Sequence, residues 1–471
     1  MIRATPKRLL TTRIPKQYKE FKYPNYNIKH NLPRLPHRQL NITGATFPST
    51  FSNNNNNNNN KNKTHIQTMV STEAQLDKLR NYTAPTYYSS SARTNEGQIT
   101  TASVWHRVPV SRRSAVFILL FLGKKGELRV LLTKRSSKLR NFPGHVALPG
   151  GKADDALESE WQVSRREMHE EIGLSSDDES LAKLGITIEH LTLLPSYLSR
   201  TFSCVRPCVG FMKFDNNNNS SNQDETDIEN TIALKLNLAL NPGESSSIFS
   251  CPLRDFLYPT MDEKPMESIE RVSYKVKWGG IPWDLRSYMF LQNNENEIDW
   301  LKDIKDLSQL EEDDILGSEL DSEDKESVTP PSFRSRASSP KRGDSNTQVV
   351  VKKLSREPST KQNLSSWGRL GSRKLEDTNE KVYDVWGLTA NILHDLSRLI
   401  YDDRLSNKRM IVGEEDMIYA LYEYGNMMQQ KERSEMERKM IHLTSVDDSQ
   451  NGFCEILPKE VFDRLVNIYK L

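Results

Sequence analysis

Two apolar runs separated by a short polar turn are the feature that most constrains the fold of this 471-residue chain. From Ser114 the chain reads SAVFILLFLGKKGELRVLLTKRS, and its β-branched and aromatic residues favour strands on both sides of GKKGE. The sequence therefore predicts a β-hairpin. The apolar run 115–122 is far shorter than the roughly 20 residues that cross a bilayer, so we interpret it as a buried strand and expect no membrane span.

A glycine pair leads from the second strand into a segment with helical periodicity. Gly150 and Gly151 permit a tight loop whose backbone N–H groups can face an anion. On a helix, residues 158–172 place apolar side chains along one stripe, with Arg165 at its edge. Gly173 can end this helix in the left-handed conformation. The sequence predicts a loop, a helix and a second loop.

Three glutamates lie together on the opposite side of this helix. Glu167, Glu170 and Glu171 are spaced i, i+3 and i+4, so each like-charged pair costs a few tenths of a kcal/mol. A hard divalent cation removes this repulsion, and Mg²⁺ or Mn²⁺ accepts carboxylates while keeping positions for water and phosphate. Arg166, four residues before Glu170, can orient that carboxylate through a charged hydrogen bond. The alternative interpretation is a solvated acidic face. Glu160 lies outside this group of glutamates, so we expect it to be replaceable.

From Gly151 the chain reads G-x6-E-x7-REMHEEIGL, which resembles the Nudix box of hydrolases that cleave nucleoside diphosphates linked to another moiety. The family has five residues before the first glutamate, whereas six precede Glu158 here. The resemblance implies an α/β fold, a Nudix-type α/β/α sandwich on a mixed sheet. It also implies Mg²⁺ (or Mn²⁺) bound by Glu167 and Glu171, with Glu170 as a further ligand or base and Arg166 completing the catalytic group.

The residues ahead of the box narrow the substrate. LLTKRSSKLRNFPGHVALPGG is similar to the coenzyme A diphosphatase signature LLTxRSxxLRxxxGxVxFPGG and departs from it at Leu148. This resemblance implies cleavage of coenzyme A, or a derivative, to 3',5'-ADP and 4'-phosphopantetheine. Coenzyme A carries a 3'-phosphate besides its pyrophosphate, and arginine binds phosphate bidentately. The candidate substrate-binding residues are Arg135, Ser136, Arg140, Gly150 and Gly151.

Three alternatives to a coenzyme A diphosphatase stay open. A Nudix hydrolase could act on NADH, ADP-ribose or an oxidised nucleotide instead. The domain could also bind coenzyme A without cleaving it and act as a scaffold, although the complete REMHEEIGL segment argues against lost catalysis. Nucleic-acid binding by the basic N-terminus has little support, because no aromatic residues cluster with its cations, and at most weak non-specific binding is expected.

Composition divides the chain into four segments. Residues 1–104 are basic and asparagine-rich, as expected of a disordered or targeting arm, and order is expected to begin near Trp105. The other three are a first part of the hydrolase domain at 105–293, with a polar insert near 215–230; a charged, disordered insert at 294–380; and closing helices with a C-terminal extension at 381–471. These asparagine- and charge-rich arms and inserts are of low complexity.

Apolar residues return to helical spacing after the charged insert. Val385, Leu388, Ile392, Leu396 and Ile400 recur at helical intervals and predict a helix that closes the domain. The stretch 414–441 is interpreted as one charged helix that docks on one face. No chemistry is assigned to it.

Targeting signals disagree with one another. The four cysteines are irregularly spaced, which favours a reducing compartment or an organelle reached from the cytosol. Residues 1–63 contain Glu20 as their single acidic residue and resemble a mitochondrial transit peptide. The C-terminal YKL is a degenerate relative of the SKL peroxisomal address, and the family resemblance also implies the peroxisome. We expect the peroxisome, with the mitochondrion as the alternative, and an organelle import receptor as a partner.

Overall fold

The computed structural model describes twelve stretches of the chain, all within the unit formed by residues 57–471. They are residues 72–84, 103–214, 236, 238–260, 266–302, 304, 306–307, 372–374, 378, 380–402, 412–442 and 452–470. The expected targeting segment 1–63, the polar insert 215–230 and most of the charged insert lie outside them. Every helix within the described stretches is too short or too polar to cross a membrane.

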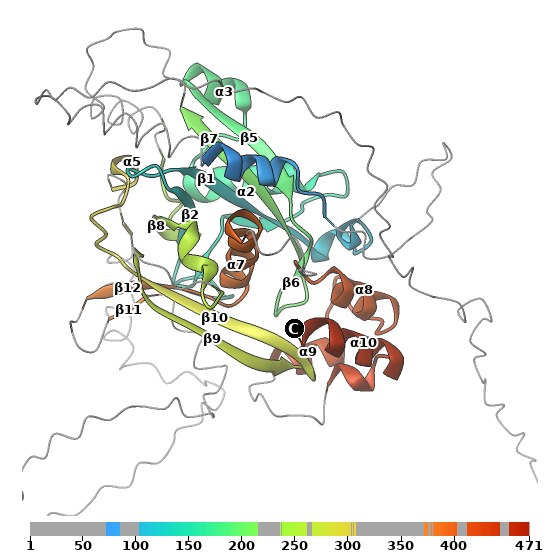
Figure 1. Ribbon diagram of the computed structural model, residues 1–471. Coiled ribbons are helices and arrows are strands. Elements are labelled where there is room, and N and C mark those ends of the chain that lie inside the picture. The colour runs from blue at the N-terminus through green and yellow to red at the C-terminus, as the bar shows by residue number, and fades with distance from the viewer. Residues whose placement is uncertain are drawn as a thin grey trace, which may run out of the picture. The chain divides into compact units, whose positions relative to one another are not determined.

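The predicted hairpin forms the centre of a mixed eight-stranded sheet (Figure 1). Strands β1 (Arg113–Leu122) and β2 (Leu128–Arg135) pair antiparallel, with Leu120 opposite Val130. On its other side β1 runs parallel to β7 (Cys204–Phe214). The remaining strands pair antiparallel to these three: β3 (Val146–Ala147), β4 (Gly150–Lys152), β5 (Ile186–Leu193), β6 (Tyr197–Leu198) and β8 (Ser245–Pro252).

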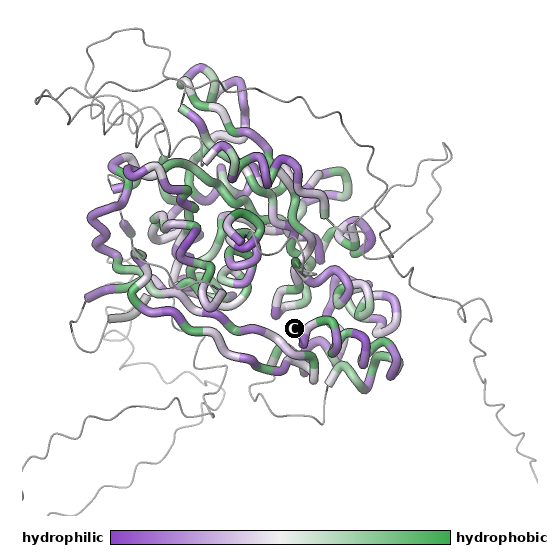
Figure 2. The backbone as a smooth tube through the Cα atoms, viewed as in Figure 1, coloured by the Kyte–Doolittle hydropathy of each residue, from purple (hydrophilic) through white to green (hydrophobic). Residues whose placement is uncertain are grey.

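Helices cover both faces of this sheet because successive side chains of a strand point to opposite faces. Phe117 and Leu119 belong to one hydrophobic cluster with helix α2 (Glu160–Ile172). Ile118 belongs to a second cluster with helix α7 (Gly387–Tyr401). Figure 2 shows hydrophobic stretches along the central strands. The predicted α/β/α sandwich on a mixed sheet is confirmed.

Helix α2 begins and ends as its sequence predicts. Ser159 and Gln162 form a capping box at its N-terminus. At its C-terminus Gly173 has φ 78°, and its N–H donates to the carbonyl of His169 at 2.9 Å. Arg165 is more buried than a position at the edge of the stripe implies. Its guanidinium pairs with Asp178 at 2.9 Å, at the start of helix α3 (Asp178–Lys183).

A second, four-stranded antiparallel sheet follows β8. Its order is β11 (Ser372–Lys374), β12 (Lys381–Trp386), β10 (Ile281–Leu291) and β9 (Ser268–Trp278). The helix expected from Val385 therefore starts later than its apolar spacing indicates. Residues 381–386 are extended because they pair with β10, and Gly387, with φ 61°, makes the turn into α7.

Folded structure also begins earlier than expected, with a helix at residues 72–80. Leu76 and Leu79, spaced i and i+3, are buried in the same cluster as α7. Arg80 pairs with Glu189 of β5 at 2.6 Å, and Lys78 donates to the carbonyl of Ile400 at 2.7 Å. The burial of two leucines and the contacts of Arg80 and Lys78 order residues 72–80, although the composition of this segment indicated a disordered arm.

Two expectations for the C-terminal half differ from the structure. Helix α5 (Asp299–Lys302) buries Trp300, so residues at the start of the expected charged insert are part of the fold. The stretch 414–441 forms two helices, α8 (Glu415–Glu423) and α9 (Glu435–His442), where one was expected. Helix α10 (Lys459–Tyr469) follows them. The four cysteines are free, and Cys454 alone among them is exposed.

Candidate active site

Helix α2 presents its glutamates to the glycine strand β4. Glu171 is 7% exposed and accepts a hydrogen bond from the backbone N–H of Gly150. The carboxylate of Glu167 lies against Gly151 so closely that a Cβ atom at this glycine would overlap it. Glu170 is the outermost of the three, with a side chain 46% exposed. The glycine pair thus brings the backbone against two carboxylates.

Burial, helped by the neighbouring carboxylates of Glu167 and Glu244, raises the pKa of Glu171 to about 8. The guanidinium of Arg135 and the Gly150 N–H act in the opposite direction. Burial also raises the pKa of Glu167, opposed mainly by Arg166. Two partly desolvated carboxylates that repel each other are characteristic of a site completed by a cation.

Arg166 connects the loop to the helix. Its Nε donates to Glu158 at 2.8 Å and one Nη donates to the carbonyl of Lys152 at 2.9 Å. The other Nη lies 3.3 Å from Glu167 and 3.4 Å from Glu170. The predicted contact with Glu170 therefore exists, but Glu158 is the nearer partner, and this pairing lowers the pKa of Glu158.

The additional loop residue does not displace Glu158. The backbone N–H groups of Leu157 and Glu158 both donate to the carboxylate of Asp155, at 2.6 and 3.1 Å. This turn directs Leu157 outward, where it is 92% exposed, and the N–H of Asp154 donates to Glu158 at 2.8 Å. A compact aspartate turn therefore absorbs the sixth residue and leaves Glu158 beside Arg166.

One observation in particular indicates that these residues can hold a divalent cation. Oε2 of Glu171 is buried and accepts no hydrogen bond within the described part of the chain. Across the same residues, no three His, Cys, Asp or Glu side chains form a metal-binding group. Mg²⁺ commonly takes only one or two carboxylates and keeps water and substrate phosphate in its other positions. Glu167 and Glu171 are the fitting ligands, with Glu170 beside them.

The predicted substrate-binding residues lie along one path from β2. Arg135, at the end of β2, faces the carboxylate site, and its buried Nε has no hydrogen-bond partner among the described residues. Ser136 donates its N–H to the carbonyl of Glu244 at 2.9 Å, while its Oγ accepts from the N–H of Lys138 at 3.2 Å. Arg140 is exposed on the loop that follows.

Sequence reasoning missed Glu244. This glutamate precedes β8, and Asn241 donates to its carboxylate at 2.9 Å. The N–H of Asn241 in turn donates to the carbonyl of Glu171 at 3.0 Å, which ties the turn to the end of α2. The NPGE turn before a strand was the available signal, but only the pairing of β8 with β2 places it beside the carboxylates.

An aromatic row beside the substrate loop was also missed. Phe142 has φ 53° and is 39% exposed, and its ring centroid lies 5.3 Å from that of His145. His145 in turn lies 5.2 Å from Trp386, the last residue of β12. Left-handed backbone at a non-glycine residue is uncommon and concentrates at functional sites.

The expectation that Glu160 is replaceable was wrong. Glu160 is buried and lies 3.2 Å from Nε2 of His106 and 3.9 Å from Nε of Arg206. Its replacement would remove a buried carboxylate from beside Arg206, which keeps its ion pair with Glu415 at 2.8 Å, and from beside the exposed His106. Glu179, exposed in the first turn of α3, is the suitable control position.

The sandwich and its carboxylate helix define a Nudix domain, and the sequence model of the NUDIX domain family matches residues 111–247. Peroxisomal coenzyme A diphosphatase 1 of Saccharomyces cerevisiae is 37% identical over 384 residues, which cover 79% of this chain and 92% of the relative. The chain belongs to the coenzyme A diphosphatase family of Nudix hydrolases.

Two further relatives match the hydrolase domain over about half of their own length or less. Nudix hydrolase 15, mitochondrial, of Arabidopsis thaliana is 38% identical over 146 residues, 31% of this chain and 42% of the relative. The peroxisomal coenzyme A diphosphatase of Mus musculus is 29% identical over 149 residues, 32% of this chain and 50% of the relative. The predicted family is confirmed.

Proposed function

We propose that this protein hydrolyses the pyrophosphate of coenzyme A, or of a derivative, to 3',5'-ADP and 4'-phosphopantetheine in a reaction that depends on Mg²⁺ or Mn²⁺. One observation carries the proposal. The buried, unpartnered carboxylate oxygen of Glu171 lies in a site that also receives the guanidinium of Arg135. Together they offer acceptors to a cation and a donor to phosphate. The similarity to the yeast relative supports the choice of substrate.

Each residue has a separate task. Glu167 and Glu171 would hold the metal, which when bound supplies Lewis-acid activation of the pyrophosphate and of the attacking water. Arg166 fixes the orientation of Glu167 through its bonds to Glu158 and to the loop carbonyl. Arg135 would bind a phosphate oxygen, and the N–H of Gly150 faces the same site, where it donates to Glu171.

Glu170 and Glu244 are the two candidates for the general base. Glu170 is the exposed member of the helix group, and Glu244 lies outside the helix where its charge raises the pKa of both Glu167 and Glu171. Both side chains are open to solvent, as a residue that passes a proton to bulk water must be. Comparing E170Q and E244Q in kcat against pH identifies the base as the variant that loses the acidic limb.

Turnover of coenzyme A by purified protein, with and without Mg²⁺, tests the proposal directly. The products are separated by chromatography, and NADH, ADP-ribose and an oxidised nucleotide serve as competing substrates. A higher kcat/KM for one of these compounds than for coenzyme A would identify that compound as the substrate instead. Binding of coenzyme A without any turnover would instead support a non-catalytic scaffold.

Replacing Arg140 by Ala is expected to reduce the stabilisation of the transition state for coenzyme A hydrolysis by about 1.5–3 kcal/mol, because a charged hydrogen bond to the 3'-phosphate is lost. The measurement is kcat/KM for coenzyme A and for dephospho-coenzyme A, which lacks that phosphate. Arg438, exposed on α9, provides the matched control R438A. Equal losses on both substrates would place Arg140 away from the 3'-phosphate.

The peroxisome is the proposed compartment. Relatives from yeast, mouse and Caenorhabditis elegans bear the word peroxisomal in their names, whereas the Arabidopsis relative is named mitochondrial. With a fluorescent tag inserted near residue 345, so that both termini stay free, we expect a peroxisomal signal that survives deletion of residues 1–63. A signal that moves from mitochondria to cytosol on deletion would favour the mitochondrial alternative.

A further inference from the structure

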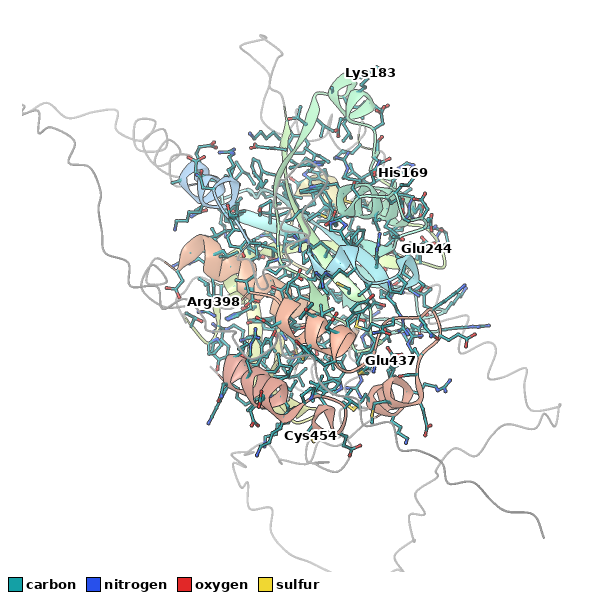
Figure 3. All side chains as sticks on the ribbon, turned by 90° about the vertical axis from the view of Figure 1, so that its right-hand side faces the viewer. His169, Lys183, Glu244, Arg398, Glu437 and Cys454 are labelled. Carbon is teal, nitrogen blue, oxygen red and sulfur yellow. The ribbon has the colours of Figure 1, made fainter. Side chains whose placement is uncertain are left out.

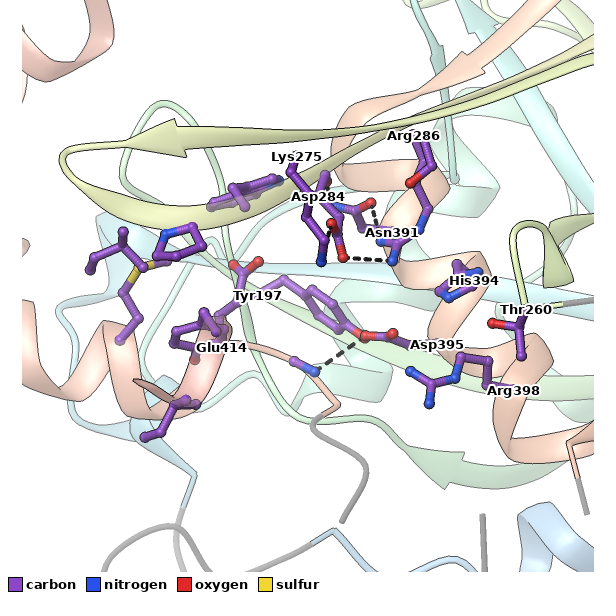
Figure 4. A pocket seen from close by; sticks show the side chains of 18 of the residues that line it. Tyr197, Thr260, Lys275, Asp284, Arg286, Asn391, His394, Asp395, Arg398 and Glu414 are labelled. Atoms are coloured by element: carbon purple, nitrogen blue, oxygen red, sulfur yellow. Dashed lines mark hydrogen bonds and ion pairs between the residues drawn. The ribbon is translucent and has the colours of Figure 1, made fainter. Parts of the chain in front are cut away.

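A cavity of about 810 Å³ lies away from the carboxylate site, between the hairpin of β9 and β10, helix α7 and the C-terminal helices α8 and α10 (Figure 4). None of its lining residues belongs to α2 or to residues 135–151. In Figure 3, Arg398 of α7 lies well apart from His169 and Glu244. The volume falls within the range of pockets that hold small molecules, roughly 300–1,000 Å³.

The first carboxylate that lines the cavity forms two ion pairs. Asp284 of β10 lies 2.7 Å from Nζ of Lys275 and accepts from Arg286 at 2.8 Å. Arg286 also donates to Asn391 of α7 at 2.9 Å, and Asn391 donates to the backbone carbonyl of Asp284 at 2.7 Å. This group joins the hairpin to α7, and within the described residues Oδ1 of Asp284 has the ion pair with Lys275 but no hydrogen bond.

The other two carboxylates are paired as well. Asp395 accepts from the hydroxyl of Tyr197 at 2.8 Å and from the N–H of Gly413 at 3.5 Å. Glu414 accepts from the N–H of Leu198 at 2.7 Å. Burial raises the pKa of both carboxyl groups, that of Glu414 to about 8, which reduces the negative charge at the cavity wall.

Two arginines of the cavity have unused hydrogen-bond donors. The guanidinium of Arg398 makes no hydrogen bond or ion pair with any described residue, and its Nε is buried. Nε of Arg286 is also buried and without an acceptor among those residues. Buried N–H donors of native proteins are almost always satisfied, so two of them beside one cavity call for an acceptor from outside the chain.

The rest of the wall is apolar. Ile281 and Trp283 line the cavity from β10, Met417 from α8 and Ile468 from α10. A ligand that satisfies Arg398 and Arg286 would place its remaining atoms against these side chains. The cavity thus combines a cationic donor pair with hydrophobic surface.

We propose that this cavity binds a small organic anion, whose carboxylate or phosphate accepts hydrogen bonds from Arg398 and Arg286 and whose apolar body contacts β10, α8 and α10. The site is distinct from the pyrophosphatase site and does not depend on the proposed activity.

Isothermal titration of the metal-free, full-length protein with hexanoate and with hexyl phosphate tests this second site, and hexanol is the uncharged control. We expect at least one anion to bind, hexanol not to bind, and R398Q to weaken binding at least about tenfold, as loss of a charged hydrogen bond implies. R438Q should behave as the wild type. The anion that binds more tightly distinguishes the carboxylate from the phosphate chemistry. Hexyl phosphate could also bind at the pyrophosphatase site. Binding there is identified by an affinity that is the same in R398Q and in the wild type.

Two results would overturn the proposal. One is equal binding of both anions by wild type and R398Q, and the other is no heat from either anion up to about 10 mM, which means that water alone fills the cavity. Because Arg398 makes no hydrogen bond or ion pair within the described residues, and acts on Asp395 only through its charge, R398Q should melt near the temperature of the wild type. Should it fail to fold, I468E tests the same site by placing a negative charge at the opposite wall, where it is expected to abolish anion binding.

Discussion

Replacing Glu171 by Gln is expected to lower kcat by roughly a hundredfold or more, because the amide keeps the size of the side chain and removes the charge that binds the metal. Saturating Mg²⁺ should not restore turnover. The matched control is E179Q, an exposed glutamate on the next helix, which should leave kcat unchanged. Near-normal turnover of E171Q at saturating Mg²⁺ would contradict the assignment of Glu171 as a ligand.

E171Q lowers kcat, but it is expected to stabilise the metal-free protein. Folding raises the pKa of Glu171 from an ordinary 4.5 to about 8, so above pH 4.5 the unfolded chain releases a proton that the folded protein retains. Stability of the wild type therefore falls between pH 4.5 and about 8 through this group. In EDTA, E171Q should melt above the wild type at pH 8 and equal it at pH 4. Excess Mg²⁺ should reverse the order at pH 8, since only the wild type binds it tightly.

Replacing Gly151 by Ala is expected to lower kcat by about ten- to a hundredfold with little change in melting temperature, because misplacing a catalytic group by an ångström has effects of this size. The new Cβ would overlap the carboxylate of Glu167, which can swing away on its flexible side chain but then leaves the metal site. Unchanged kcat in G151A would show that the position of Glu167 is not needed.

The neighbouring glycine gives the contrasting result. A Cβ at Gly150 would lie 2.6 Å from Cα of Val116 and also overlap the carbonyl of Ala115, and φ there is 155°. Backbone cannot move aside as a side chain does, so G150A should lose stability by roughly 1–3 kcal/mol. Thermal melts of both variants check the pair. Equal destabilisation of G150A and G151A would contradict this division between fold and site.

Local sequence patterns predicted the elements that hold the site. The hairpin follows from its apolar runs and polar turn, and α2 follows from its apolar stripe and from Gly173 as terminator, although its first residue is Glu160 and not Glu158. Spacing along one helix also placed Glu167, Glu170 and Glu171 on one side. These features depend on residues at most a few positions apart, so the chain determines them without reference to its distant parts.

Patterns shared by strands and helices were less informative. Residues 381–386 satisfy a helical spacing, yet pairing with β10 makes them a strand. The helix at 72–80 escaped prediction because two leucines in a polar stretch bury only against α7 and its neighbours. Glu160 was expected to be replaceable because it lies outside the motif, and it is buried beside His106 and Arg206, which come from separate segments.

The sequence by itself determined the family, the helix that carries the three glutamates and the loop that leads into it, because each is encoded in contiguous residues. Tertiary structure alone decided that Glu158 holds Arg166 despite the longer loop, that Glu244 stands beside Glu171, and that the donors of Arg286 and Arg398 line one cavity. Strand pairing and helix docking bring these groups together from sequence separations of up to 112 residues. Their electrostatic coupling depends on distance and burial in space, and neither quantity can be read from spacing along the chain.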